Sequence, residues 1–216
     1  MARSIFEAVI ACALPEDVFH GSPHAFDRFT LDHMNSGSGS HTYGWGLYFA
    51  DKMQMAQQFR NRQGRSTGRG HLYHAQLPDD DQFLEWDEPL SAQPYEVRTI
   101  LEKNGLFPKG DIEIIPVPNG WGIKRDWVDL GWCRDREDAE ENAEEYATPE
   151  FAEGLSGTGS ELYRHLTEKL GSPKAASLYL RSIGIPGHRY ENIHGVGGMF
   201  YVLYDADRVS IKSRED

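Results

Sequence analysis

Short apolar and aromatic runs, each bounded by glycine, proline or serine, divide the first third of the chain into candidate strands. Residues 18–20 form one such run, and the Gly-Ser-Pro sequence at 21–23 predicts a turn directly after it. Residues 47–50 form a second short strand, and residues 71–77 alternate as a third strand should. Between the second and third strands, apolar residues at helical spacing predict a helix from about residue 51 to 61, capped by its first residue, Asp51.

The last third of the chain predicts two helices with clear ends, followed by strands. Each helix begins at a serine and stops before a glycine, the first covering residues 160–170 and the second residues 173–183. After a glycine-rich loop, residues 200–204 predict a buried strand, and residues 209–211 an edge strand. Near the start, residues 4–14 predict a short leading helix, and the Ser-Gly-rich segment 35–40 predicts a mobile flap.

The middle of the chain, from about residue 83 to 159, has a less regular pattern and is predicted to be an insertion in a single domain of residues 1–216. Within it, residues 94–103 suit a helix, and a hairpin is expected to turn at Asn119 and Gly120. Residues 134–153 are strongly acidic. The default interpretation of such a run is a solvated helix face, and recognition of a partner is the alternative.

Composition and charge limit the classes of function. The 216 residues suffice for one domain with a real core, and the net charge of −12 argues against general binding to nucleic acid or anionic membrane. The two cysteines predict neither a disulfide framework nor a metal site, which favours a reducing, cytoplasmic setting. No apolar run is long enough to span a membrane. One basic cluster stands out, with two interpretations: a solvated hairpin loop, or a contact for phosphate or an acidic partner. It consists of Arg60, Arg62, Arg65 and Arg69.

Two stretches together give the strongest functional signal. They are His20-Gly21-Ser22 at the end of one strand and Gly46-Leu47-Tyr48-Phe49-Ala50-Asp51 on the next. With the late strand at 200–204, they resemble the ADP-ribosyltransferases of the diphtheria-toxin and poly(ADP-ribose) polymerase branch. A second aromatic, Phe59, follows Tyr48 by eleven residues, as in that branch. The pattern is most similar to ADP-ribosyltransferase domains of bacterial and phage polyvalent proteins.

The resemblance implies NAD as substrate and assigns roles to particular residues. Gly21 would contact the nicotinamide carboxamide through its backbone, with support from Ser22. Tyr48 and Phe59 would stack on the nicotinamide ring, and His20 would hydrogen-bond the adenosine ribose. The remaining predicted NAD contacts are Tyr43 and Phe200.

One position departs from the family pattern. The family's third motif places a glutamate where this chain has Phe200, and a phenyl ring can neither act as a base nor hydrogen-bond a ribose hydroxyl. We therefore expect transfer of a single ADP-ribose rather than chain elongation. Glu191, in the loop before the strand, is the candidate replacement, and an exposed loop charge is the alternative. With His20 and Tyr48 it completes the predicted catalytic set.

The resemblance also implies the fold and the setting. We expect an α+β fold of two packed, mainly antiparallel sheets around an NAD cleft, with flanking helices. The acceptor would be a macromolecule, either protein or nucleic acid, and the setting a bacterial or phage toxin or effector, with an antitoxin or immunity protein as a possible partner. Three alternatives stay open: an NAD glycohydrolase, a degenerate NAD or ADP-ribose binder, and an interaction module that uses the acidic segment 134–153.

Overall fold

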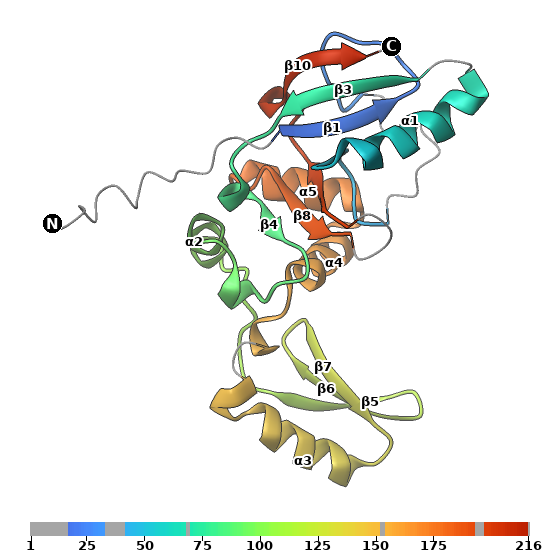
Figure 1. Ribbon diagram of the computed structural model, residues 1–216. Coiled ribbons are helices and arrows are strands. Elements are labelled where there is room, and N and C mark those ends of the chain that lie inside the picture. The colour runs from blue at the N-terminus through green and yellow to red at the C-terminus, as the bar shows by residue number, and fades with distance from the viewer. Residues whose placement is uncertain (1–16, 33–41, 68–69, 152–153, 193–196, 216) are drawn as a thin grey trace, which may run out of the picture. The chain divides into compact units, whose positions relative to one another are not determined.

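The chain divides into two compact units, the first made from both ends of the sequence and the second from its middle (Figure 1). The first unit consists of two segments, Met1–Phe83 and Pro186–Asp216, and the second unit covers Leu84–Ile185. The computed structural model describes residues 17–32, 42–67, 70–151, 154–192 and 197–215, with side chains except at 62–67. The predicted leading helix at 4–14 and the flap at 35–40 lie outside the described residues.

Six strands of the first unit form one sheet in the order β10-β3-β1-β2-β9-β8. Every pairing between them is antiparallel. Their bounds are β1 (Asp17–Ser22), β2 (Leu47–Ala50), β3 (His71–Gln76), β8 (Gly187–Glu191), β9 (Met199–Leu203) and β10 (Ser210–Glu215). The early and late strands predicted from the sequence thus share a sheet, with β9 inserted between β2 and β8.

The two faces of this sheet have different partners. One face carries the hydrophobic core, with Phe49 of β2, Tyr73 of β3 and Tyr201 of β9 all nearly inaccessible to water. The other face is covered in part by α1 (Met53–Thr67), which contacts β1, β2 and β3. Because side chains alternate along a strand, Tyr48 and Phe200 lie on the α1 face, opposite their neighbours Phe49 and Tyr201.

Helix α1 is longer than predicted and begins later. The amide of Met55 donates to the carbonyl of Lys52 at 3.0 Å, so the first turn starts at Lys52 and Asp51 does not cap it. The helix continues through Thr67, so Arg60, Arg62 and Arg65 lie on a helix and not in a loop, which was one of the two interpretations of this cluster.

The second unit contains the residues predicted to be irregular, and they are more regular than expected. After β4 (Leu84–Glu85), they form α2 (Tyr95–Lys103), a three-stranded antiparallel sheet and α3 (Arg136–Tyr146). The strands of this sheet are β5 (Glu113–Val117), β6 (Gly120–Arg125) and β7 (Val128–Cys133). The predicted hairpin is confirmed, but its turn lies one residue earlier than expected: Val117 pairs with Gly120, so the turn residues are Pro118 and Asn119, and Asn119 adopts the left-handed φ of 68°.

Two helices complete the second unit. Helix α4 (Gly159–Leu170) begins at Thr158 in a capping box with Glu161, two residues before the predicted cap at Ser160. Helix α5 (Pro173–Ser182) begins as predicted, with the Ser172 hydroxyl accepting from the amide of Ala175. Both ends predicted from glycine are confirmed, because Gly171 and Gly184 follow the two helices with positive φ.

The α+β class is confirmed, and the described residues contain two sheets with mainly antiparallel pairing. The early and late strands form one sheet of the first unit, and the second sheet belongs to the middle segment. That segment begins at Leu84, next to the predicted boundary at 83, and extends to Ile185, so it includes α4 and α5.

Candidate functional site

The three stretches that carry the sequence motifs lie next to one another in the sheet. Strands β1, β2 and β9 are consecutive neighbours, although about 180 residues of sequence separate the first from the last. Phe19 pairs with Ala50, and Ala50 pairs with Phe200, so a single register row crosses all three strands. The candidate residues His20, Tyr48 and Phe200 each lie within two positions of this row.

His20 is held by one hydrogen bond and a shell of aromatic rings. Its Nδ1 donates to the carbonyl of Tyr48 at 2.7 Å. The rings of Phe29 and Phe49 lie 5.2 and 5.5 Å from the imidazole, and those of Phe26 and Tyr73 slightly farther away. Burial lowers the pKa of His20, and the bond to the carbonyl opposes this only in part. The ring is therefore neutral at pH 7, and its Nε2 has the lone pair of an acceptor.

Tyr48 points to the other face. Its hydroxyl donates to the carbonyl of Gly44 at 2.8 Å, and Gly44 has φ 108°, which only glycine adopts readily. The predicted glycine turn thus anchors the Tyr48 ring. Because Phe49 belongs to the core face with His20, the side chains of His20 and Tyr48 lie on opposite faces of the sheet. The two residues meet through the backbone of Tyr48, not through their side chains.

Gly21 and Ser22 are both fixed by local contacts. A Cβ at Gly21 would lie 2.4 Å from the carbonyl oxygen of Ala56 and 2.6 Å from the amide nitrogen of Arg60. Only a glycine therefore lets α1 pack this closely on β1. Ser22 is buried, and its Oγ accepts from the amide of His24 at 3.1 Å, which holds the turn after β1.

Four aromatic rings form a continuous row on the α1 side of the sheet. Tyr43 stacks on Tyr190 with ring centroids 3.8 Å apart, and Tyr190 lies 5.4 Å from Phe200. Phe200 meets Phe59 edge-on at 6.1 Å. In the middle of the row Tyr190 is buried and Phe200 half-buried, whereas the ends are open: Tyr43 is 38% exposed and Phe59 41% exposed. Three of the four were predicted NAD contacts, and we call the set the aromatic row.

Tyr190 is the member of the aromatic row that the sequence analysis missed. It lies on β8 and pairs with Phe200 across the ladder. Burial raises the pKa of its hydroxyl, and the nearby hydroxyls of Tyr48 and Tyr43 raise it further. The Tyr48 hydroxyl therefore interacts electrostatically with Tyr190, a member of the aromatic row. The missed signal was the spacing of Tyr190 and Phe200 on either side of a glycine loop, which is typical of a hairpin.

Glu191 is the last residue of β8 and is exposed. It pairs with Met199, whose side chain packs against the core cluster, whereas Tyr190 and Phe200 face α1. By alternation, Glu191 projects from the sheet face opposite the aromatic row. The structure therefore does not bring this carboxylate together with Tyr48 or Phe200.

A buried pair lies beside the row on the same strands. His188 and Tyr204 are both fully buried, and Nδ1 of His188 is hydrogen-bonded to the Tyr204 hydroxyl. Burial lowers the pKa of His188 to about 3, against a smaller opposite effect of a bond to the backbone of Tyr43. The pair is thus neutral and fixes the loop that carries Tyr43.

Asp51 lies in the site without the capping role that the sequence predicted. Its Oδ1 is buried and has no hydrogen-bond partner among the described residues. Its backbone amide donates to the carbonyl of Met199 at 3.1 Å. A Cβ at Gly198 would approach Oδ1 to 2.5 Å, so this glycine makes room for the carboxylate. Unpaired buried oxygens are rare and call for an explanation.

We expect Asp51→Asn to stabilise the protein by about 1 kcal/mol, because it replaces a charge whose buried Oδ1 has no hydrogen-bond partner among the described residues with a neutral amide. Thermal unfolding checks this against Asp27→Asn, which changes a fully exposed carboxylate and should leave the melting temperature unchanged. A lower melting temperature for Asp51→Asn would show that the carboxylate is stabilising in place.

Other features of the described residues bear on the site. No group of three or more His, Cys, Asp or Glu side chains there is placed to hold a metal ion. None of the helices in the described part is long and apolar enough to cross a membrane. Two pockets of about 40 and 170 Å³ are lined by neither His20 nor the aromatic row. Comparison with family models, curated proteins and solved structures found no match to this chain.

Proposed function

We propose that the first unit binds NAD and transfers a single ADP-ribose to a macromolecular acceptor. The observation that carries the proposal is the aromatic row, built by strands β8 and β9, helix α1 and the turn before β2. Planar rings such as nicotinamide stack on aromatic faces. Tyr43 and Phe59, at the two ends of the row, are the exposed members on which such a ring can stack. The adjacency of β1, β2 and β9, which the sequence resemblance requires, is a second support.

The chemistry needs positioning more than a strong base. The bond from the ribose carbon to the nicotinamide nitrogen breaks, and its electron pair leaves with nicotinamide. The acceptor then forms a bond to that ribose carbon and loses a proton to solvent or to a carboxylate. Residues that hold the nicotinamide ring and the ribose in one geometry accelerate such a step by orientation and electrostatics. In this proposal Tyr48 and Phe59 hold the ring and Phe200 supports it. His20, whose side chain lies on the opposite face of the sheet, positions Tyr48 through its hydrogen bond to the Tyr48 carbonyl.

A second candidate is binding of NAD or ADP-ribose without turnover. Two observations favour it: a phenyl ring occupies the third-motif position, and Glu191 projects from the other face of the sheet. In that case the same row would hold the ligand with no carboxylate near the ribose. The two candidates differ in whether a carboxylate lies near the ribose. In the transferase, Asp51, next to the end of β2, is the carboxylate that would take this role.

The decisive measurement is incubation of the purified chain with NAD labelled in the adenylate part, with and without cell lysate. We expect label on macromolecules and loss of that label by at least tenfold in Tyr48→Ala, because the ring no longer stacks. Tyr48→Phe keeps the ring and removes the hydroxyl that donates to Gly44, so it should retain most of the transfer. Tyr95→Ala, a fully analogous change at a 75% exposed tyrosine of α2, serves as the matched control.

The products separate the alternatives. Sensitivity of the labelled material to nuclease or protease identifies the acceptor class. Release of nicotinamide without labelled macromolecules would make the protein an NAD glycohydrolase. NAD binding in calorimetry with neither product would favour the degenerate binder, and absence of binding would refute both proposals.

A further inference from the structure

The second unit contains a pocket of about 170 Å³ that the proposed NAD chemistry does not use. Its apolar floor is formed by Val128 and Leu130 of β7 and by Leu155. Tyr146, at the end of α3, and Phe151 form an aromatic wall, with ring centroids 5.6 Å apart at 76°. Asp129 and Glu161 are the charged residues of its lining.

The size of the pocket limits what enters it. Sites for drug-sized molecules and cofactors have volumes of roughly 300–1,000 Å³, so this one is too small for a dinucleotide. It is large enough for one long side chain. Apolar walls suit the aliphatic part of lysine or arginine, aromatic faces attract the cationic head, and carboxylates pair with it.

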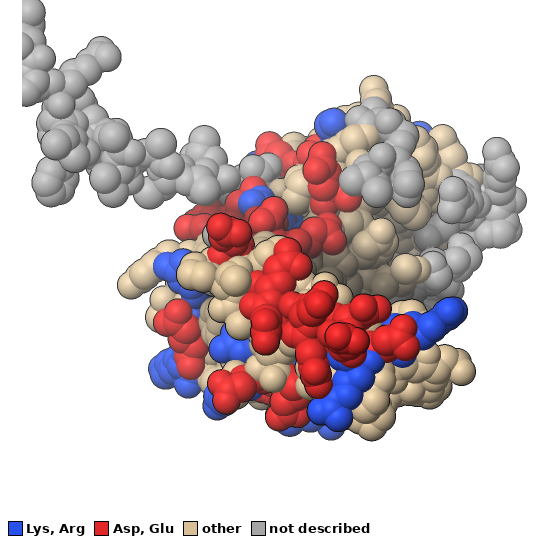
Figure 2. Space-filling model, turned by 90° about the horizontal axis from the view of Figure 1, so that it is seen from below, with Lys and Arg blue, Asp and Glu red and all other residues tan. Residues whose placement is uncertain are grey.

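The surface beside the pocket is strongly negative, as Asp129 and Glu161 are. Residues 134–153 contain nine acidic and two basic residues, and α3 supplies six of the acidic ones. Figure 2 shows acidic side chains predominating on the face that carries α3. Within α3 the structure has one ion pair, between Arg136 and Glu140, so the helix presents a large excess of negative charge. Such a surface attracts a basic partner and repels nucleic acid.

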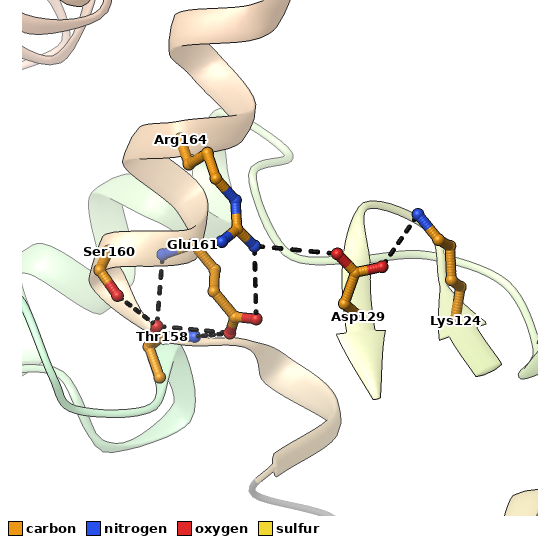
Figure 3. Close-up of polar contacts among 6 residues, drawn as sticks. All are labelled: Lys124, Asp129, Thr158, Ser160, Glu161 and Arg164. Carbon is orange, nitrogen blue, oxygen red and sulfur yellow. Dashed lines mark hydrogen bonds and ion pairs between the residues drawn. The ribbon is translucent and has the colours of Figure 1, made fainter. Parts of the chain in front are cut away.

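Asp129 and Glu161 already pair with a cation of the chain itself. The guanidinium of Arg164 lies between Asp129 and Glu161, as Figure 3 shows, at 4.0 and 3.8 Å from their oxygens. These separations are too long for good hydrogen bonds, and the Arg164 side chain is 57% exposed. Lys124 also pairs with Asp129, at 2.9 Å. Arg164 is therefore a weakly held occupant of the carboxylate pair.

We propose that this pocket, with α3 beside it, is a docking site for a lysine or arginine side chain in a basic segment of a partner protein. The partner's cation displaces Arg164 from Asp129 and Glu161, its aliphatic part covers Leu130 and Leu155, and the rest of the segment runs along α3. The site lies wholly within the second unit and does not depend on NAD binding.

The test is fluorescence anisotropy of the full chain with labelled twelve-residue peptides at about 150 mM salt, where exposed charges are screened beyond about 8 Å. The probes are alternating Gly-Lys and Gly-Arg peptides, with Gly-Glu as the charge control. We expect binding of the basic probes only. Phe151→Leu, which keeps the bulk but removes the aromatic face, and Asp129→Asn should each weaken it at least fivefold. Glu137→Gln, which removes one charge from the first turn of α3, should weaken it less than twofold.

Arg164→Ala gives the sharpest result. If Arg164 competes with the partner's cation, its removal should tighten binding of a basic probe at least threefold. Loss of fold would only weaken binding, so tighter binding cannot come from damage to the unit. No binding of the basic probes, equal effects of Asp129→Asn and Glu137→Gln, or unchanged affinity in Arg164→Ala would each overturn the proposal. Spermidine binding as tightly as the peptides would replace the protein partner with a small polyamine.

Discussion

Acidification from pH 7 to pH 4.5 is expected to destabilise the first unit by about 2–3 kcal/mol through His188 alone. The buried His188 has a pKa of about 3 in the folded protein, against an ordinary value of 6.5. Between these values the unfolded chain binds a proton that the folded chain excludes, so stability falls as pH falls. The full difference corresponds to about 4–5 kcal/mol and is reached near pH 3.

Hydrogen exchange of the amides in β8 and β9, measured at several pH values, tests this prediction locally. His188→Gln keeps a hydrogen-bonding group beside Tyr204 but removes the titration, so its stability should depend less on pH. Burial also lowers the pKa of His20, so the stability of His188→Gln should still fall as pH falls, but less steeply. Equal pH slopes for the wild type and His188→Gln would contradict the assignment.

Gly21→Ala is expected to cost about 3 kcal/mol or more of folding free energy, at the upper end of what overpacking costs. The added methyl would lie 2.4 and 2.6 Å from backbone atoms of α1, which cannot move aside as a flexible side chain can. The helix must shift away from β1, taking Phe59 from the aromatic row with it.

Denaturant unfolding and hydrogen exchange of residues 53–61 measure this effect. The matched control is Gly154→Ala, where an added methyl has nothing within 4 Å and should change stability little. The result also separates two roles of Gly21. If Gly21→Ala keeps its stability and loses only NAD binding, then position 21 needs a glycine for contact with the ligand and not for close packing of the helix.

Elements whose ends are marked by glycine, proline or serine residues were predictable from the sequence. Strands β1 and β2 are bounded by turns that glycine and proline specify, and α5 begins at a Ser-Pro pair, so short-range chemistry determines them. Strand β8 was missed because Gly187, His188 and Arg189 are poor strand formers, and its conformation depends on pairing with β9. Strand β7 was missed because the turn before it uses Asp126, with φ 55°, instead of glycine.

The candidate site was predictable only as a set of positions. The sequence identifies His20, Tyr48 and Phe200, and the sheet order brings their strands together. It cannot say that the side chains of His20 and Tyr48 project from opposite faces, because that depends on how β1 and β2 pair. Nor can it predict that Tyr190 completes the aromatic row, since this follows from a long-range ladder.

The division of the first unit between the two ends of the sequence has a consequence for synthesis on the ribosome. The second unit is continuous and can form its contacts once Ile185 has emerged. The sheet of the first unit must wait for β9, which pairs with β2 in the interior of the sheet. Until β8 and β9 are made, β2 lacks the neighbour with which it pairs on that side, and neither Tyr190 nor Phe200 is present. A nascent chain that stops before β9 therefore lacks the aromatic row, so the site can form only after translation has passed Leu203.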